Sequence, residues 1–336
     1  MKALCSVATG GPSTLQLLNV PDPVPGRGEI EVAVAACSIN YPDVLVIEDK
    51  YQSKPKRPFA PGSEIAGTVH ALGEGVEGFA VGDRVIALLG GSGGLAERAV
   101  AAADNVYHLP DDRGFIEGSA LLITYSSAIH ALKDRGRLKA ADTLLVLGAG
   151  GGIGLATVEI GKAIGARVVA AVSSEDKAKA ARLAGADDAL IYGQPPFSHA
   201  SARALADSLK AAVGEGGADV ILDPVGGEYS EAALRAIAWK GRFLTVGFPA
   251  GIPRLPLNLA LLKGCDICGV FQGAFAAREA TANKDNVRQL FEWWRTGKIN
   301  PRVTDVFPLE RGGEAIGRLA RRVAIGKLVV QIAVPL

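Results

Sequence analysis

Residues 144–154 read LLVLGAGGGIG, an apolar run that breaks into four glycines among the five positions 150–154. The run is typical of a buried strand, and the residues after it, up to Lys162, have the apolar spacing of a helix. The first turn of such a helix presents free backbone N–H groups and the positive end of its dipole, and the glycines let a pyrophosphate approach the backbone. This stretch therefore predicts a dinucleotide-binding turn between a strand and a helix.

The glycine pattern differs in one position from G-x-G-x-x-G. In the register that fits, alanine stands in the first glycine position. The predicted pyrophosphate contacts are Ala149, Gly151, Gly152, Ile153 and Gly154. A glycine cluster alone also fits an ordinary strand-to-helix turn, so the pattern that follows it decides the interpretation.

After this turn the chain alternates strand and helix patterns at least four times. The strand patterns are continuous apolar runs, as expected for parallel strands that are covered on both faces. They are LLVLG (144–148), RVVAAV (167–172), ALIYG (189–193), DVILD (219–223) and RFLTVGF (242–248). This alternation predicts an α/β domain with a doubly wound parallel sheet, and it favours the cofactor interpretation of the glycine turn.

The first hundred residues have a different texture. Residues 29–36, 64–72 and 83–89 are strand-like and are separated by segments rich in proline and glycine, which predicts an antiparallel β domain. The segment KLVVQIAV (327–334) resembles these strands in composition. We therefore expect the end of the chain to return to the first domain.

Composition restricts the class of protein. The 336 residues are 49% hydrophobic, and 36 basic against 35 acidic side chains leave a formal charge of +1. This is typical of a folded protein of two domains, without the basic tract that would bind a nucleic acid. No segment approaches the roughly eighteen uninterrupted apolar residues of a membrane span, and the N-terminus does not resemble a signal peptide. Because the four cysteines are also scattered, we expect a cytoplasmic protein without nucleic-acid or membrane partners.

The end of the second predicted strand indicates which dinucleotide binds. NAD enzymes usually place an acidic residue there, where it binds the ribose 2′-OH. Here Val172 occupies that position, and the hydroxyl and ammonium groups of Ser173, Ser174 and Lys177 follow it. These groups suit a 2′-phosphate; the alternative is that Ser173 or Ser174 caps the next helix and Lys177 is a solvated surface charge. We therefore predict NADPH as the cofactor.

Segments along the whole chain match one family. They are PDPVPGRGE (21–29), INYPDVL (39–45), KYQSKPKRPFAPGSEIAGTV (50–69), GEGVEGFAVGDRV (73–85), AGGGIG (149–154), AVSSEDK (171–177), DVILDPVGGEY (219–229), GRFLTVGF (241–248) and IGKLVV (325–330). In these segments the chain resembles the medium-chain dehydrogenase/reductases, and among them the zinc-independent, zeta-crystallin-like NADPH:quinone oxidoreductases. The resemblance implies a GroES-like catalytic domain of residues 1–125 and 265–336, with a Rossmann NADPH-binding domain of residues 126–264 between its two parts.

One departure concerns metal binding. Zinc-dependent relatives of this family read G-H-E where this chain has Ser63 in place of the histidine, and a serine does not replace a metal-binding imidazole. Their structural zinc lobe needs four cysteines after the GDRV segment, whereas residues 88–100 contain none. Cys265 and Cys268 have the spacing of a metal or redox pair, but no second pair completes a zinc tetrad. We predict no bound metal.

This prediction bears on the acceptor. A metal stabilises the alkoxide that forms when hydride reaches an isolated carbonyl, whereas a quinone or α,β-unsaturated carbonyl spreads the charge, so that fixed hydrogen-bond donors suffice. Asn40, Tyr41 and Asp43 match the loop that the family places on the nicotinamide side, and Tyr51 follows shortly after. We assign the two tyrosines as candidate oxyanion or proton donors. The alternative for each is a half-buried packing residue.

The resemblance implies five further cofactor contacts. They are Thr124 at a helix start, Tyr192 beside the 2′-phosphate, Gly247 and Phe248 at a strand end near the nicotinamide, and Lys327 in the IGK segment. The alternatives are a helix cap for Thr124, packing for Tyr192 and a surface charge for Lys327.

The sequence thus predicts an NADPH-dependent reductase that transfers hydride to quinones or other conjugated carbonyls without a metal. One alternative is a reductase of 2-alkenals or of short enoyl-CoA esters such as acryloyl-CoA, for which Lys54, Lys56 and Arg57 could form a basic channel. A second, non-enzymatic alternative is an NADPH-binding redox sensor or a crystallin-like structural protein. The apolar segment CDICGVF (265–271) could pair with its copy at a sheet edge, so we expect a homodimer.

Overall fold

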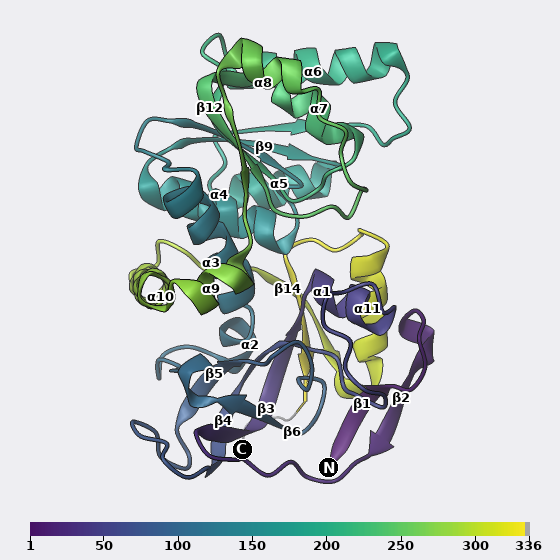
Figure 1. The fold of residues 1–336 in the computed structure, drawn as a ribbon, viewed down its shortest axis with the longest axis vertical. Coiled ribbons are helices and arrows are strands. Elements are labelled where there is room, and N and C mark those ends of the chain that lie inside the picture. The colour runs from purple at the N-terminus through teal and green to yellow at the C-terminus, as the bar shows by residue number, and fades with distance from the viewer. Residues whose placement is uncertain (333–336) are drawn as a thin grey trace. The chain divides into compact units, whose positions relative to one another are not determined.

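A computed structural model describes residues 1–332 of the chain. The last two residues of the predicted C-terminal strand (333 and 334) and the last four of the predicted domain segment (333–336) lie outside the described part. The chain divides into two compact units, Met1–Ile123 with Pro301–Leu336 and Thr124–Asn300. In Figure 1 the purple and blue N-terminal ribbon and the yellow C-terminal ribbon make up the first unit, whereas the teal and green ribbon makes up the second.

The first unit is built on a mostly antiparallel, seven-stranded sheet, which confirms the predicted β domain. Its order is β14-β15-β3-β4-β5-β7, and β6 also pairs with β3. The strands are β3 (Glu29–Ile39), β4 (Glu64–Leu72), β5 (Arg84–Leu88), β6 (Arg98–Ala102), β7 (Val106–His108), β14 (Val303–Pro308) and β15 (Lys327–Gln331), with a separate hairpin of β1 (Lys2–Ser6) and β2 (Leu15–Asn19).

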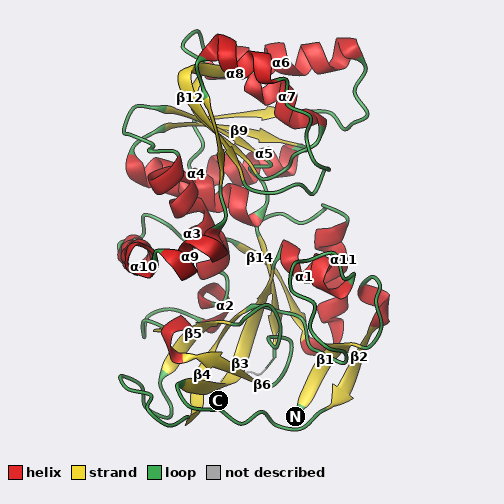
Figure 2. Ribbon diagram, viewed as in Figure 1, coloured by secondary structure: helices red, strands yellow, loops and turns green. Residues whose placement is uncertain are grey.

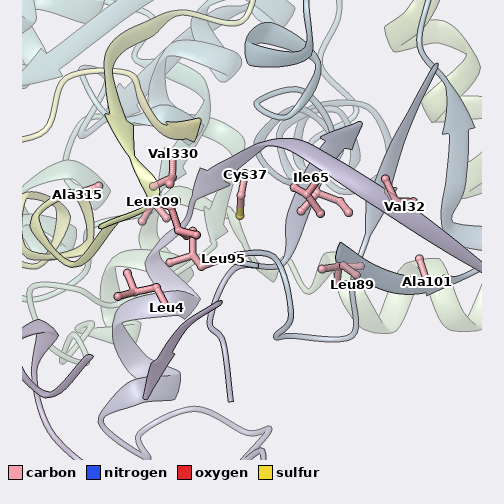
Figure 3. Close-up of a cluster of buried hydrophobic side chains, with 14 of the residues drawn as sticks. Leu4, Val32, Cys37, Ile65, Leu89, Leu95, Ala101, Leu309, Ala315 and Val330 are labelled. Carbon is pink, nitrogen blue, oxygen red and sulfur yellow. The ribbon is translucent and has the colours of Figure 1, made fainter. Parts of the chain in front are cut away.

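The C-terminal part of the chain is part of this sheet. Strand β15 pairs antiparallel with β3, with Leu328 opposite Ile39 and Gln331 opposite Ala36. Figure 3 shows side chains from both ends of the sequence, such as Leu4 and Val330, in one buried apolar cluster. The helices of this unit are α1 (Tyr41–Ile47), α2 (Phe115–Gly118) and α11 (Gly312–Ala320).

The second unit is built on a six-stranded parallel sheet with the order β10-β9-β8-β11-β12-β13, which confirms the doubly wound fold. Its strands β8–β12 coincide with the five predicted apolar runs to within a few residues. The strands are β8 (Thr143–Leu147), β9 (Arg167–Val172), β10 (Asp188–Ile191), β11 (Ala218–Asp223), β12 (Ile237–Thr245) and β13 (Asp266–Gly269).

Helices cover both faces of this sheet. Figure 2 shows α4 and α5 on one side of the strands and α6 and α7 on the other. The helices are α4 (Gly152–Ile164), α5 (Glu175–Leu183), α6 (His199–Val213), α7 (Glu228–Leu234), α8 (Leu257–Lys263), α9 (Gln272–Arg278) and α10 (Ala280–Arg295), preceded by α3 (Leu122–Ile129) and a π-helical turn (His130–Arg135). In residues 1–332, none of the helices is both long and apolar enough to cross a membrane.

The strand order of the parallel sheet indicates where a ligand would bind. Strand order reverses between β8 and β11, and ligands of open parallel sheets bind beyond the carboxyl ends of the strands at this reversal. The glycine turn of residues 148–151 follows β8 directly, so it lies at that end of the sheet.

Residues 265–300 belong to the second unit in the structure, whereas the sequence analysis grouped them with the first domain. The physical reason is that β13 pairs in parallel with β12, with Ile267 opposite Phe243, and so extends the second sheet. The segment forms the outer edge of that sheet. Its next helices, α9 and α10, follow in the same unit.

Candidate functional site

The glycine turn is shaped by close backbone packing. A methyl group on Gly154 would overlap with the carbonyl oxygen of Gly148, so the first turn of α4 lies directly on the end of β8. Ala149 is fully buried and its N–H donates to the Ala171 carbonyl at 3.2 Å, so the alanine in the first glycine position belongs to the packing. Around Gly151, by contrast, the nearest atom to such a methyl would be 3.6 Å away. The turn therefore leaves open space where the helix presents its free N–H groups, as a pyrophosphate requires.

The residues predicted to bind the 2′-phosphate lie together at the end of β9. The Lys177 ammonium donates to the Ser173 hydroxyl at 3.1 Å, and the Ser174 hydroxyl accepts the Lys177 backbone N–H at 3.4 Å as the N-cap of α5. Burial lowers the pKa of Lys177. The lysine stem also covers the glycine turn, because a methyl on Gly150 would lie 2.6 Å from its Cβ and Cγ. The turn and the serine–lysine pair thus form one continuous surface.

The backbone of Tyr192 lies next to this surface. Its N–H donates to the carbonyl of Val172, the last residue of β9, at 2.8 Å. The ring itself is almost fully buried and packs against Tyr229, with ring centroids 4.8 Å apart. The packing role considered for this tyrosine is therefore present.

The turns after β11 and β12 complete this end of the sheet. The Asp223 carboxylate accepts the N–H groups of Val225 (2.9 Å) and Gly226 (2.8 Å) and the Ser230 hydroxyl, and burial raises the pKa of Asp223. Sequence reasoning gave Asp223 no role. An acidic residue at the end of an apolar strand pattern could have identified it as a candidate.

Gly247 and Phe248 lie on the neighbouring turn, directly after β12. A methyl group on Gly226 would be 3.1 Å from the Phe248 Cα, so the two turns touch at backbone distance. The Phe248 ring is 44% exposed. Gly148 in turn contacts the turn after β11, because a methyl on it would lie 2.7 Å from Val225 Cγ2. The turns after β8, β11 and β12 therefore meet at the point where the strand order reverses.

The second group of predicted residues lies in the first unit, where β3 leads into α1. The Asp43 carboxylate caps this junction: it accepts the N–H of Asn40 at 2.7 Å, the N–H of Gly62 at 3.0 Å and the Ser63 hydroxyl at 3.4 Å. Complete burial raises the pKa of Asp43 to about 6. Asp43 therefore holds the start of α1 against the loop that contains Ser63.

Lys327 is buried rather than a surface charge. It starts β15, is only 3% exposed, and its ammonium lies 2.6 Å from Asn40 Oδ1 and 3.6 Å from Glu64 Oε2. Burial lowers the pKa of Lys327, and the carboxylates of Glu64 and Asp43 oppose that shift. The structure thus brings together Asn40 and Lys327, which were predicted for different parts of the site.

Glu64 is the buried partner that sequence reasoning did not single out. Its Oε2 accepts the Ser38 hydroxyl at 2.8 Å and the Asn40 amide at 3.3 Å, and its Oε1 accepts the N–H of Ile123 at 3.0 Å. The available signal was an acidic residue at the start of an otherwise apolar strand pattern, EIAG.

The remaining predicted residues differ in exposure. Tyr41 and Tyr51 are partly exposed and pack against the apolar core of the first unit, whereas Asn40 and Asp43 are buried. Thr124 is buried in α3. Of the four residues predicted to lie near the acceptor, Tyr41 and Tyr51 are thus the two that have exposed surface.

The residues around Ser63 present oxygen atoms but no metal-binding cluster. In the described residues, 1–332, no three histidine, cysteine, aspartate or glutamate side chains lie close enough together to share a metal ion. Cys265 and Cys268 are free, partly buried thiols, and burial raises the pKa of both.

Each of the two units matches a known domain family. Residues 26–111 match the model of the alcohol dehydrogenase GroES-like domain, and residues 152–290 match that of the zinc-binding dehydrogenase domain. The quinone oxidoreductase-like protein 2 homolog of Nematostella vectensis is 33% identical over 91% of this chain and 82% of its own. The mouse quinone oxidoreductase is 33% identical over 94% of this chain and 92% of its own. A mycobacterial protein solved in complex with NADPH is 28% identical, with a TM-score of 0.89 over 98% of this chain and 99% of its own.

Proposed function

The chain belongs to the quinone oxidoreductase family of medium-chain dehydrogenase/reductases, and from this we propose that it is an NADPH-dependent reductase of quinones and other conjugated carbonyls. The mycobacterial neighbour with bound NADPH supports the cofactor. The single observation in this chain that carries the proposal is the Lys177 ammonium, held over the glycine turn and paired with Ser173 where NAD enzymes have an acid.

The residues of the second unit fit NADPH in charge and shape. The first turn of α4 offers N–H groups beside the open space at Gly151, which suits the pyrophosphate. Lys177 and Ser173 offer one charge and a hydroxyl for the 2′-phosphate, and Tyr192 lies directly after the end of the adjacent strand, β10. Gly247 and Phe248 and the buried hydroxyl residue Thr124 are proposed for the nicotinamide half.

Bound NADPH supplies a hydride, and one added proton completes the reduction of a quinone to a hydroquinone. In the first unit, the hydroxyls of Tyr41 and Tyr51 are proposed to donate hydrogen bonds to the acceptor oxygen as it gains charge. Asn40 and Asp43 are proposed to act through the backbone, because both are buried at the start of the helix that carries Tyr41. No step requires a metal, and a metal-free enzyme remains our prediction.

The enoyl-CoA alternative is less well supported. Arg57, one of the three basic residues considered for a phosphate channel, donates to both oxygens of Asp49 at 2.9 and 3.1 Å and to the Ile47 carbonyl at 2.9 Å. Its guanidinium is therefore already bound within the unit. Lys54 and Lys56 alone are an exposed pair of charges, which is the ordinary state of lysine.

We also propose that the protein is a cytoplasmic homodimer. Strand β13 is an edge strand, and apolar side chains near it in sequence or space are exposed, including Trp239 (66%), Leu261 (80%) and Ile267 (38%). An unprotected apolar edge of this kind favours pairing. Sedimentation of Ile267→Asp should show a monomer, whereas Val81→Asp, an exposed control in the first unit, should keep the parent's mass; a monomeric parent would refute the dimer. The free thiols of all four cysteines support a reducing compartment.

The function is tested by following NADPH oxidation with a panel of simple quinones, enones and short enoyl-CoA esters. We expect turnover of quinones with NADPH, and a kcat/KM at least about tenfold lower with NADH because the lysine–phosphate contact is missing. Tight NADPH binding without reduction of any acceptor would refute the enzyme and favour a redox sensor or structural protein. Turnover confined to the CoA esters would favour the alternative substrate class.

A further inference from the structure

Two opposite charges are buried on either side of one neutral amide in the first unit. The Lys327 ammonium lies 2.6 Å from Asn40 Oδ1, and the Asn40 Nδ2 lies 3.3 Å from Glu64 Oε2 and 3.3 Å from the Ser38 hydroxyl. All four side chains are at least nine-tenths buried. They come from β3, β4 and β15 and the loop before α1, which are distant in sequence but adjacent in the sheet.

The two charges dictate the orientation of the amide. An ammonium has only donors, so it must face the amide oxygen; a carboxylate has only acceptors, so it must face the amide nitrogen. Turning the Asn40 amide by half a turn would place donor against donor and acceptor against acceptor. The Ser38 backbone carbonyl accepts from the Asn40 Nδ2 at 3.4 Å and favours the same orientation, but this neutral contact is weaker than the contacts with the two charges.

Asn40 also connects this charged pair to α1. Its backbone N–H donates to Asp43 Oδ2 at 2.7 Å, and Asp43 Oδ1 accepts from Gly62 at 3.0 Å. The next residue, Tyr41, begins the helix. The Asn40 side chain is therefore anchored to the charges, while its main chain is anchored to the first turn of the helix.

We propose that Lys327 and Glu64 are positioning residues, which lock the Asn40 amide in one orientation and thereby fix the place of Tyr41 at the start of α1. This inference rests on the proposed function, in which Tyr41 contacts the acceptor. It gives Lys327 a role inside the first unit in place of the cofactor contact that the family resemblance implied.

A purely structural ion pair is the competing explanation, and a double substitution separates the two. Lys327→Met or Glu64→Gln alone leaves the other charge buried without its partner, so each single variant should melt at lower temperature. Together they remove both charges. The Gln oxygen stays on the Ile123 N–H, so the Gln nitrogen faces Asn40 and favours the turned amide, whereas the Ser38 carbonyl still favours the parent's orientation. The two orientations then compete. The double variant should therefore regain most of the parent's melting temperature but not its turnover, because the amide is no longer held in one state.

For the double variant we expect kcat with a quinone to fall about 10- to 100-fold, as for other small misplacements of a reacting group, with an unchanged Kd for NADPH. Parent-like kcat in a stable double variant would show that the pair is only structural. A large loss of NADPH affinity would show instead that Lys327 contacts the cofactor. Either result overturns the proposal.

A second measurement does not depend on turnover. In protein labelled with ¹⁵N-asparagine, the Asn40 side-chain amide is identified by its loss in Asn40→Ser. We expect one sharp pair of amide proton signals in the parent and doubled or broadened signals in the double variant. If the double variant keeps one sharp pair, the charges do not select the orientation. If the parent reduces no quinone, the proposed function fails, but this measurement still decides the positioning.

Discussion

A single methyl group added to the glycine turn tests how the chain selects its cofactor. In Gly150→Ala the new carbon would lie 2.6 Å from both Cβ and Cγ of Lys177 and 3.1 Å from Cδ, where contacts below 3.0 Å essentially never occur. The overlap involves the base of the side chain, so rotation of its far end does not relieve it. The lysine stem must move, and the ammonium is displaced from its place beside Ser173.

The size of the effect follows from the contact that is lost. A hydrogen bond to a charged group contributes about 1.5–3 kcal/mol, which corresponds to roughly 10- to 150-fold in affinity. We therefore expect Gly150→Ala to raise the Kd of NADPH by about that factor and to leave the Kd of NADH nearly unchanged. Both constants are measured by quenching of protein fluorescence during titration with each cofactor.

Two controls isolate the cause. Lys177→Gly should produce the same selective loss, and adding Gly150→Ala to it should have little further effect, because this substitution removes both the Cβ and the Cγ that the methyl would meet. Gly151→Ala places a methyl in the open space of the turn, 3.6 Å from its nearest neighbour, and should weaken NADPH and NADH equally. The reasoning is refuted if Gly150→Ala weakens both cofactors equally, or weakens NADPH as strongly when Lys177 is absent.

Three further predictions concern the first unit and the metal. Tyr41→Phe and Tyr51→Phe should each lower kcat about 10²-fold with an unchanged Kd for NADPH if the hydroxyl donates to the acceptor, and a variant with the parent's kcat identifies a packing residue. The pKa of Asp43 is raised from 3.8 to about 6, so its contribution to stability is fully present below pH 3.8 and is lost as the pH rises through 6. Urea unfolding should show that the cost of Asp43→Asn is about 2 kcal/mol smaller at pH 7 than at pH 4, and a constant cost would contradict the shift. Dialysis against a chelator should leave kcat unchanged and elemental analysis should find less than stoichiometric metal, whereas loss of activity that zinc restores would overturn the metal-free prediction.

Local patterns were sufficient for most of the second unit. Buried parallel strands are continuous apolar runs, and the strand before the glycine turn was found because LLVL ends at a glycine. The pairing of Ser173 with Lys177 was also within reach, because the two residues lie four apart at the start of one helix. These features depend on residues that are neighbours in the sequence, so they can be predicted from a single sequence.

The edge of that sheet shows where local patterns fail. Strand β13 has only four residues, Asp266–Gly269, and most of them are exposed, so neither its length nor an alternating pattern indicated which sheet it would join. Its position is determined by pairing with β12, whose residues lie more than twenty positions earlier. A family resemblance supplied a domain boundary, but the contacts of residues 265–300 are made with the second unit.

The buried charges of the first unit were beyond sequence reasoning for the same reason. Lys327 and Asn40 are 287 positions apart, and their contact exists only because β15 pairs with β3. From the sequence, Lys327 in IGK has two plausible states, a cofactor contact or a solvated charge. Burial against Asn40 and Glu64 is a third, and it becomes visible only when the register of the sheet is known.

The position of that lysine also bears on the choice of acceptor. Ser63 stands where zinc-dependent relatives have a metal-binding histidine. The positive charge next to Glu64 is the ammonium of Lys327 and not a metal ion. A metal with an open coordination position can bind the acceptor oxygen directly, but the Lys327 ammonium is enclosed and its near neighbours are Asn40, Glu64 and the Ile39 carbonyl. In the proposed arrangement this charge orients its neighbours, because the ammonium is too enclosed to bind an acceptor oxygen directly. In the metal-free enzyme that we predict, charge on the acceptor would be spread by the acceptor itself or bound by hydroxyl donors, and quinones and conjugated carbonyls meet this requirement better than isolated ketones.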